Sequence, residues 1–307
     1  MDVKIGRDAP PQHSGVPGPP RTHPALERGW QGWHVRFHQW RKNAAPCLAL
    51  LGALLALGPP SQAQTTSPYR LVSGREWMLL GTGATLGTTS LALRAAIEPL
   101  TAQQIALLDF DDVNEFDRRN AAPYREDDAA DALLIASYAI PLTLLASSPI
   151  RRDWGTVAVM WTETTLLQLG FTGIVKTTAK RTRPYVYDPN APMELKQKPS
   201  ARMSFFSGHT TQSAANSFFA ARVFSDYTKS TRAKVLVWTG AALYPALVGH
   251  LRRETGHHFN TDVIVGYCVG ALIGYLVPEL HRARGHDFIR TQTIQDGVGI
   301  GLHFAFR

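Results

Sequence analysis

Three short clusters of residues in this 307-residue chain have side chains that bind anions or transfer protons. They are Lys176 with Arg183; Ser207, Gly208 and His209; and Arg252, His258 and Asp262. Each cluster stands at the edge of a long apolar segment of helical length. We therefore expect a bundle of helices to bring the three clusters to one pocket.

The basic and small residues of these clusters suit a phosphate group. Arg183 and Arg252 have planar guanidinium groups whose paired N–H donors match phosphate oxygens, and Lys176 adds a compact positive charge. Ser207 is expected to begin a helix, whose free N–H groups and dipole favour an anion. Together these residues predict a phosphate-binding cage.

Two histidines beside this cage, His209 and His258, can divide the work of phosphoryl transfer. A neutral imidazole can attack phosphorus, and a protonated one can give its proton to the departing oxygen. His258 and Asp262 are four residues apart, which would place them on one face of a helix. At that spacing the carboxylate can orient the ring.

The clusters resemble the signature of the type 2 phosphatidic acid phosphatase superfamily. That signature is Lys-x6-Arg-Pro, then Pro-Ser-Gly-His, then Ser-Arg-x5-His-x3-Asp, and its eight functional residues are all present within residues 176–262. The resemblance implies a six-helix bundle of the phosphatidic acid phosphatase type 2/haloperoxidase type. It also implies a phosphatase that needs neither a metal nor another cofactor.

The resemblance further implies a role for each residue. His258 is the expected nucleophile that forms a phosphohistidine, Asp262 orients it, and His209 is the acid that protonates the leaving group and later activates water. The expected phosphate-binding residues are Lys176, Arg183, Ser207, Gly208 and Arg252. His257 lies five residues from Asp262 rather than four, so we interpret it as a flanking ring.

Two positions depart from the signature. Phe206 stands where the family usually has Pro, and Leu251 stands where it usually has Ser. Neither change removes a charged group, so we expect them to affect efficiency and substrate fit. For Lys180 and Arg181, between the first two basic residues of the signature, the alternative to a role in the site is a solvated or lipid-headgroup-facing basic helix end.

The elements that must position these clusters are predicted from apolar runs rich in Ala and Leu. Helices are expected at Trp77–Ala96, Ala129–Ser147, Trp154–Thr178, His209–Phe224, Lys234–Leu251 and Asp262–Leu280. The predicted fold class is therefore all-α, with one short strand-like tail in Val298–Phe306, where apolar residues alternate. The acid-rich segment Asp109–Asp131 lacks the Gly and Glu of a calcium loop and is expected to be a solvated connector.

The first 63 residues have the three-part plan of an export signal. A long basic region ends at Lys42, an apolar run covers Cys47–Leu57, and small residues before and at Ala63 suit cleavage there. We therefore divide the chain into four parts: a signal (1–63), a first helix with an acidic connector (64–128), a catalytic core (129–280) and a tail (281–307).

Three segments come close to the length of a membrane span: Ala132–Ala146, Val235–Val248 and Val263–Pro278. We therefore expect an inner-membrane protein with a periplasm-facing site and lipid phosphates as substrates. A soluble periplasmic bundle acting on small phosphomonoesters, as a nonspecific acid phosphatase, is the nearest alternative. A vanadium haloperoxidase-like enzyme and a non-catalytic protein that binds lipid headgroups are the others.

The net charge of +8 does not indicate a nucleic-acid partner. Residues 1–63 carry seven Lys/Arg and three Asp/Glu, so about half of the excess charge lies in the signal region. No run of basic residues with interleaved aromatics follows it. The oligomeric state is left open by the sequence.

Overall fold

The computed structural model describes residues 67–283, 289–294 and 297–302. All the described residues belong to one compact unit within residues 57–307. The export signal predicted for residues 1–63 therefore lies outside the described residues.

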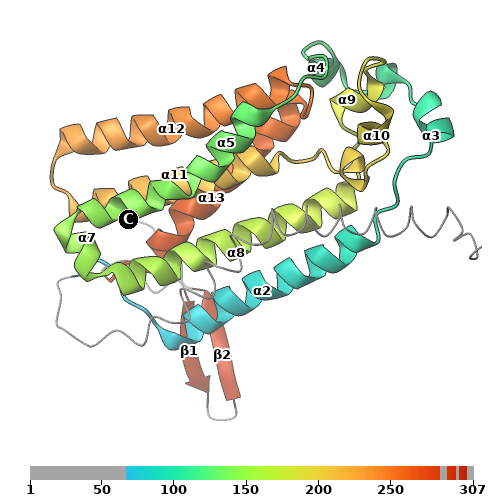
Figure 1. Ribbon diagram of the computed structural model, residues 1–307. Coiled ribbons are helices and arrows are strands. Elements are labelled where there is room, and N and C mark those ends of the chain that lie inside the picture. Colours follow the sequence, from blue (N-terminus) through green and yellow to red (C-terminus); the bar gives the residue numbers. More distant parts are fainter. Residues whose placement is uncertain (1–66, 284–288, 295–296, 303–307) are drawn as a thin grey trace, which may run out of the picture. The chain divides into compact units, whose positions relative to one another are not determined.

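Five long helices lie where the apolar runs predicted them (Figure 1). They are α2 (Ser73–Ala95), α8 (Trp154–Ala179), α11 (Gly208–Tyr227), α12 (Thr231–Glu254) and α13 (Asn260–Leu280). Helix α8 packs along α2, and α11 packs against both α12 and α13. The described part of the chain is thus mainly helical, as the sequence predicted.

The remaining predicted helix, Ala129–Ser147, is divided into short pieces. It consists of α5 (Asp128–Ser137), α6 (Ala139–Leu142) and the 3-10 turn η2 (Thr143–Ala146), and α7 (Ser148–Arg152) follows. Pro141 has no N–H for the carbonyl of Ser137 and its ring crowds that carbonyl, so the first piece ends at Ser137. The short pieces still pack against α11.

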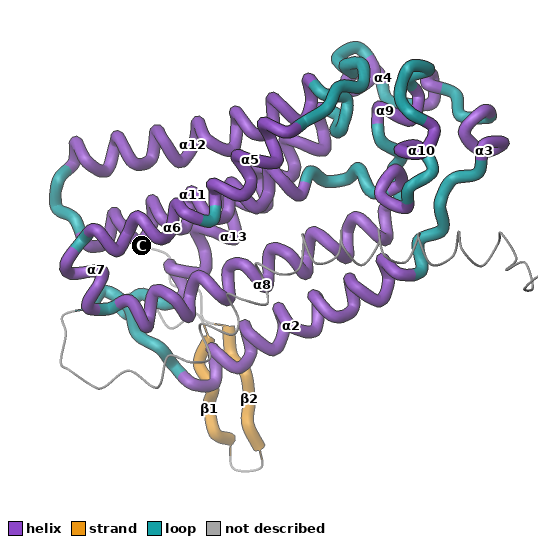
Figure 2. The backbone as a smooth tube through the Cα atoms, in the orientation of Figure 1, coloured by secondary structure: helices purple, strands orange, loops and turns teal. Residues whose placement is uncertain are grey.

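Short elements and loops gather at the end of the long helices where α8 ends and α11 begins (Figure 2). They are α3 (Ala102–Ala106), η1 (Phe110–Asp112), α4 (Glu115–Arg118), α9 (Pro184–Tyr187), α10 (Met193–Lys196) and η3 (Pro199–Arg202). A small apolar core fixes them to one another, and its buried members are Leu100, Tyr185, Val186, Ala191 and Ala201. This end of the bundle therefore has its own packing.

Helix α13 approaches the backbone of α11 through three glycines spaced four residues apart. A Cβ atom on Gly266 would lie 2.7 Å from the carbonyl oxygen of Ser207, and one on Gly270 would overlap the carbonyl oxygen of Thr211. Gly274 faces Ala215 in the same way. Small residues at this spacing let two helices pack backbone to backbone.

The C-terminal strand expected within Val298–Phe306 has a partner that the sequence did not predict. Strands β1 (Ile289–Ile294) and β2 (Gly297–Leu302) pair antiparallel, with Ile289 opposite Leu302. Residues 303–307 lie outside the described part of the chain.

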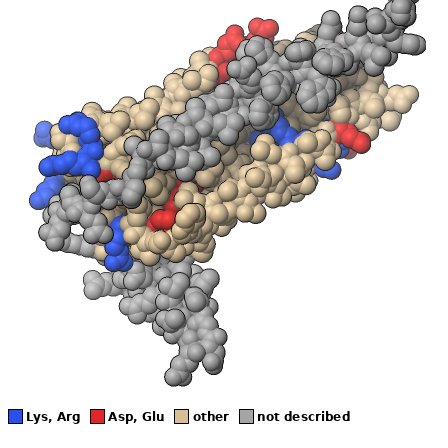
Figure 3. Space-filling view, turned by 60° about the horizontal axis from the view of Figure 1, so that its bottom comes forward, with Lys and Arg blue, Asp and Glu red and all other residues tan. Residues whose placement is uncertain are grey.

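Two segments are long and apolar enough to cross a membrane, judged by length and composition: Asp128–Ala146 and Asn260–Leu280. Large apolar side chains are also exposed along three helices: Trp77 and Leu91 on α2, Leu236 and Leu243 on α12, and Ile264 and Leu272 on α13. Figure 3 shows a face of the molecule whose described surface carries few charged side chains. Large apolar side chains exposed along several helices are typical of contact with a membrane or another protein.

The contact of Gly270 with α11 predicts an asymmetry between two glycine substitutions. Gly270→Ala should lower the thermal unfolding midpoint, because overpacking costs about 1–3 kcal/mol and exceeds the gain in helix propensity of about 1 kcal/mol. Gly240→Ala on α12 is the matched control, since a Cβ there meets nothing within 4 Å, and it should raise the midpoint. A Gly270→Ala variant as stable as Gly240→Ala would contradict this packing.

Candidate active site

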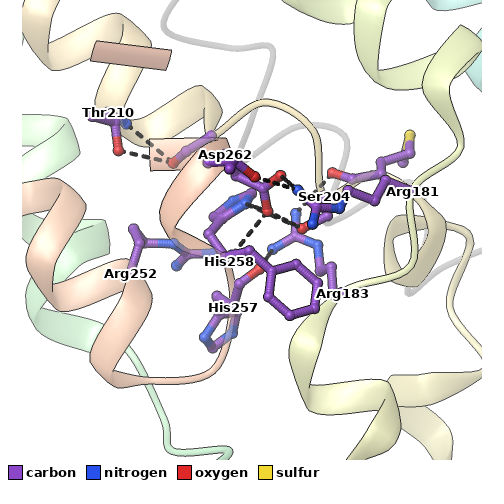
Figure 4. Close-up of polar contacts among 12 residues, drawn as sticks. Arg181, Arg183, Ser204, Thr210, Arg252, His257, His258 and Asp262 are labelled. Carbon is purple, nitrogen blue, oxygen red and sulfur yellow. Dashed lines mark hydrogen bonds and ion pairs between the residues drawn. The ribbon is translucent and has the colours of Figure 1, made fainter. Parts of the chain in front are cut away.

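All eight signature residues lie at the end of the bundle where the loops gather. Lys176 lies in the last turn of α8, Ser207 caps α11, and Arg252 lies in the last turn of α12. The backbone N–H of Ser207 donates to the carbonyl oxygen of Asp262 at 2.9 Å, which ties the start of α11 to the start of α13. Segments far apart in the sequence therefore meet at one place (Figure 4).

His258 is completely buried and lies against the carboxylate of Asp262. The ring Nδ1 is 3.4 Å from Asp262 Oδ2 and 3.5 Å from Ser204 Oγ. A carboxylate only accepts, so this contact favours the tautomer with hydrogen on Nδ1. The lone pair is then on Nε2, the nitrogen that faces away from Asp262.

The His258–Asp262 contact has a different cause from the one predicted. His258 precedes α13, which begins at Asn260, so the two residues do not share a helical face. Asp262 is instead the third residue of α13, and its Oδ2 accepts the backbone N–H of Phe259 at 2.9 Å. The carboxylate that caps the helix is therefore the one that reaches back to the ring.

Arg181 holds the other oxygen of Asp262, a contact that the sequence analysis missed. Its guanidinium donates to Asp262 Oδ1 and to Asp117 Oδ2, both at 2.7 Å, and lies 4.4 Å from the centre of the Phe259 ring. Ser204 Oγ donates to Asp262 Oδ2. The interpretation of Arg181 as a solvated helix end is wrong.

Asp117 comes from the acidic segment that was expected to be a solvated connector. It is fully buried and accepts the backbone N–H of Thr261 at 2.9 Å and its hydroxyl at 2.6 Å. Burial alone would raise the pKa of Asp117. The hydrogen bonds from Arg181 and Thr261 outweigh burial and hold this pKa below its ordinary value. Asp117 is thus ionised and fixes the first turn of α13.

Two further acids of the same segment hold site residues. Asp127 is buried and accepts from Arg252 at 2.8 Å and from the Thr255 hydroxyl at 2.9 Å. Asp131, which is exposed, lies 2.7 Å from His209 Nε2 and 3.5 Å from the Arg252 guanidinium. The segment is therefore part of the site wall, and only some of its acids are solvated.

Lys176 and Arg183 lie beside each other and both donate to the carbonyl oxygen of Met203. Lys176 Nζ donates to the carbonyl of Met203 at 2.9 Å, and Arg183 donates to the carbonyls of Ser200 at 2.9 Å and His257 at 3.2 Å. These are neutral acceptors, so neither cation is neutralised by its own contacts.

The start of α11 is built as an anion site would be. The Ser207 hydroxyl accepts from the backbone N–H of Thr210 at 3.4 Å and from its hydroxyl at 2.9 Å. A Cβ on Gly208 would lie 3.4 Å from the Lys176 side chain, so the absence of a side chain here brings Lys176 close to the helix N-terminus. Both features favour negative charge.

Crowded positive charge depresses several pKa values in this pocket. Burial and nearby Arg183 lower the pKa of Lys176 well below its ordinary value and that of Arg252 to about 10. Burial and Arg183 also lower the pKa of His258 well below its ordinary value. Burial and Arg252 lower the pKa of His209 to about 4, against the opposing effect of Asp131. An anion bound among these groups would relieve their mutual repulsion.

His257 points away from the Asp262 carboxylate. Its Nδ1 lies 3.1 Å from the carbonyl oxygen of Thr255, and its ring packs against Tyr124 and Tyr185. It therefore flanks the pocket, although the helical spacing from which we predicted this does not apply to residues that precede α13. Among the described residues, the one group of His and acidic side chains with the spacing of a metal site lies outside this pocket.

Gly256 makes the turn that separates the two histidines from α12. Its φ of 68° is a left-handed conformation that favours glycine. A Cβ here would lie 2.8 Å from the carbonyl oxygen of Ala122, while its own carbonyl accepts the backbone N–H of Tyr185 at 2.9 Å. The turn is thus fixed from two other segments.

The two departures from the signature lie in the protein interior or at its edge. Phe206 is buried and its ring lies 6.1 Å from that of Phe171. Leu251 is half-buried, one residue before Arg252. Phe206 thus fills space next to Ser207 with an aromatic ring.

The sequence matches a known protein family. The sequence profile of the PAP2 superfamily matches residues 134–286. The lipid A 4'-phosphatase of Porphyromonas gingivalis is 35% identical over 80 residues, which are 26% of this chain and 30% of that protein. The chain therefore matches less than a third of the length of this curated relative.

Two crystal structures are similar to parts of the chain. Aquifex aeolicus LpxE matches 50% of this chain and 85% of its own, with 22% identity and a TM-score of 0.36. A transmembrane PAP2 type phosphatidylglycerolphosphate phosphatase from Bacillus subtilis matches 64% and 94%, with 21% identity and a TM-score of 0.40. With the profile matched across the helices that carry the signature residues, the chain belongs to the PAP2 superfamily.

Proposed function

We propose that this chain is a phosphatase that hydrolyses phosphate esters through a phosphohistidine, without a metal, and that its substrates are lipid phosphates. One observation carries the proposal. A buried imidazole, oriented by a carboxylate, lies among cations that keep unsatisfied charge. A nucleophile for phosphorus and a cage for its oxygens are the two parts that phosphoryl transfer needs.

In the first step, Nε2 of His258 attacks the phosphorus while the bond to the leaving oxygen breaks and His209 gives that oxygen its proton. Asp262 holds the hydrogen on Nδ1, so the attacking lone pair is on Nε2. In the second step, His209 takes a proton from water, the water oxygen bonds to phosphorus, and the P–N bond breaks to release inorganic phosphate.

The phosphoryl oxygens would be held by Lys176, Arg183 and Arg252, together with Ser207 and the Gly208 amide. The Nε of Arg252 is buried and has no partner in the described structure, so this donor is available to a ligand. The carbonyls that hold Lys176 and Arg183 leave both positive charges to act on the phosphate. Charge that spreads over three oxygens in the transition state is stabilised by such preset donors.

Lipid substrates are favoured by the surface next to the site. Large apolar side chains are exposed along α12 and α13, and both helices end or begin in site residues. We propose membrane association, with the site on the extracytoplasmic side to which the predicted signal would deliver it.

Replacing the nucleophile gives the direct test. His258→Ala should lower phosphate release from a lipid phosphate and from a generic monoester by about 1,000-fold or more, since the cage alone cannot form the covalent intermediate. The control variant His250→Ala, at an exposed histidine of α12, should retain full activity.

Undiminished turnover in His258→Ala would contradict the mechanism. Halide oxidation with added vanadate in place of phosphate release would indicate a haloperoxidase. A preference for the water-soluble ester would indicate a nonspecific acid phosphatase.

The depressed pKa of His209 predicts different pH limits for kcat/KM and kcat. In the free enzyme the pKa is about 4, so the acid form is lost as the pH rises above that value and kcat/KM falls. A bound phosphoryl group adds negative charge and raises this pKa, so kcat should fall only at a higher pH. Because burial and Arg183 keep the pKa of His258 low, the nucleophile stays neutral throughout.

Measuring both constants from about pH 4 to pH 9 checks this expectation. Asp131→Asn should move the alkaline fall to lower pH, because the hydrogen bond that Asp131 accepts from His209 raises the pKa of His209. His250→Gln is the control and should leave both profiles in place. A rate that keeps rising into alkali would exclude His209 as the acid.

Arg181 provides a test of the carboxylate's position. Arg181→Ala should lower kcat by about 100-fold through misplacement of Asp262, with little change in KM, because Arg181 is not among the proposed phosphate ligands. Arg181→Lys should recover part of the loss, since one ammonium can contact one of the two carboxylates. Equal loss in kcat and in substrate affinity would place Arg181 in the phosphate cage instead.

A further inference from the structure

A second polar cluster lies at the end of α13 away from the candidate active site. Glu76 is in the first turn of α2, Glu163 is on α8, and His281 directly follows α13. His281 Nε2 is 2.9 Å from Glu76 Oε2 and 3.1 Å from Glu163 Oε2. Nothing in the proposed phosphatase mechanism uses these residues.

The orientation of the His281 ring is fixed from its other side. Its Nδ1 is 2.7 Å from the carbonyl oxygen of Val277, and a carbonyl only accepts, so Nδ1 carries a hydrogen. Nε2 therefore faces the two carboxylates as a ligand atom. Histidines that bind metals usually have this second hydrogen bond to a carbonyl or carboxylate.

Glu163 is fully buried, and neither of its carboxylate oxygens has a hydrogen-bond partner in the described structure. Its Oε2 is within 3.1 Å of His281 Nε2, but the ring hydrogen that would satisfy it is directed to Glu76. The second oxygen of Glu76 is already held, at 2.6 Å by the backbone N–H of Val72 and at 2.8 Å by Arg75. A buried acid without a partner is costly, so the cluster lacks one cationic or hydrogen-bonding contact.

The spacing of the ligand atoms suits a metal ion. Oxygen and nitrogen ligands lie about 2.0–2.2 Å from a divalent ion such as Zn²⁺. Neighbouring ligands around such an ion are then about 3 Å apart, as are His281 Nε2 and the two carboxylate oxygens. All three ligand atoms lie within 4.8 Å of one another.

We propose that Glu76, Glu163 and His281 form a binding site for one divalent transition-metal cation, with Zn²⁺ as its best probe. An imidazole with two carboxylates is a donor set suited to this class of ion. The ion would tie the start of α2 to α8 and to the end of α13. The inference does not depend on the proposed phosphatase activity.

Without an ion, a proton supplies positive charge to the cluster. Burial lowers the pKa of His281, but the adjacent carboxylates of Glu163 and Glu76 outweigh it and raise the pKa to about 9. The metal ion must replace the proton on Nε2, so binding at neutral pH should release protons. Titration calorimetry in buffers of different ionisation enthalpy measures this release.

The experiment uses the full chain, stripped with a chelator and then titrated with Zn²⁺. We expect about one ion per chain by elemental analysis after desalting, and a higher thermal unfolding midpoint. Glu163→Gln and His281→Gln should weaken binding by more than about 100-fold, since loss of a second-shell partner alone costs 10–100-fold. His250→Gln controls for ions bound by an exposed imidazole and should bind as the wild type does.

If the wild-type protein takes up no ion, the inference is wrong and the cluster is a buried ion pair. Uptake that persists unchanged in both Glu163→Gln and His281→Gln would also overturn it, because the ion would then lie elsewhere, for example among the histidines of the candidate active site. Circular dichroism checks the fold of each variant. Glu76→Gln, at the partly exposed edge of the cluster, is the substitute if a buried variant does not fold, and it should likewise lose the ion.

Discussion

The close packing of α11 against α13 sets the positions of most groups in the site. Where the glycines of α13 meet the backbone of α11, the two helices are held at one distance, and the Ser207 N–H can reach the carbonyl of Asp262. The anion-binding start of one helix is thereby placed beside the carboxylate that starts the other. A shift of either helix would move the cage and the nucleophile's partner together.

Like charges are the second constraint on this pocket. The buried cations of the pocket repel one another, and the fold offsets that repulsion with acids from the chain between α2 and the first turn of α5. Asp117 acts through Arg181, Asp127 binds Arg252, and Asp131 contacts His209. The positive charges of Lys176 and Arg183 remain for a bound phosphate. The contacts of these three acids account for part of the acidic character of the segment.

The long helices and the signature residues could be predicted from the sequence, because both are local patterns. An apolar run of helical length is visible over about 20 residues, and the spacing of His258 and Asp262 is fixed by the chain itself. The contacts of Arg181 could not be predicted in this way, since its partners Asp117 and Asp262 lie 64 and 81 residues away. Charged residues in an acidic or basic stretch are usually solvated, so the burial of Asp117 had no local signal. Pro141 was visible in the sequence, and its effect on Ser137 follows from its missing N–H.

The turn at Gly256 positions the two histidines that follow it through contacts of the backbone. Its left-handed conformation and its fit against Ala122 leave no space for a β-carbon, and its carbonyl anchors Tyr185. A survey of this protein that ranks positions by the reactivity of their side chains would pass over residue 256, which has none. Any larger residue there would nevertheless displace the strand of chain that carries both neighbouring imidazoles, so sequence variation at this position should be as restricted as at the ionisable groups themselves.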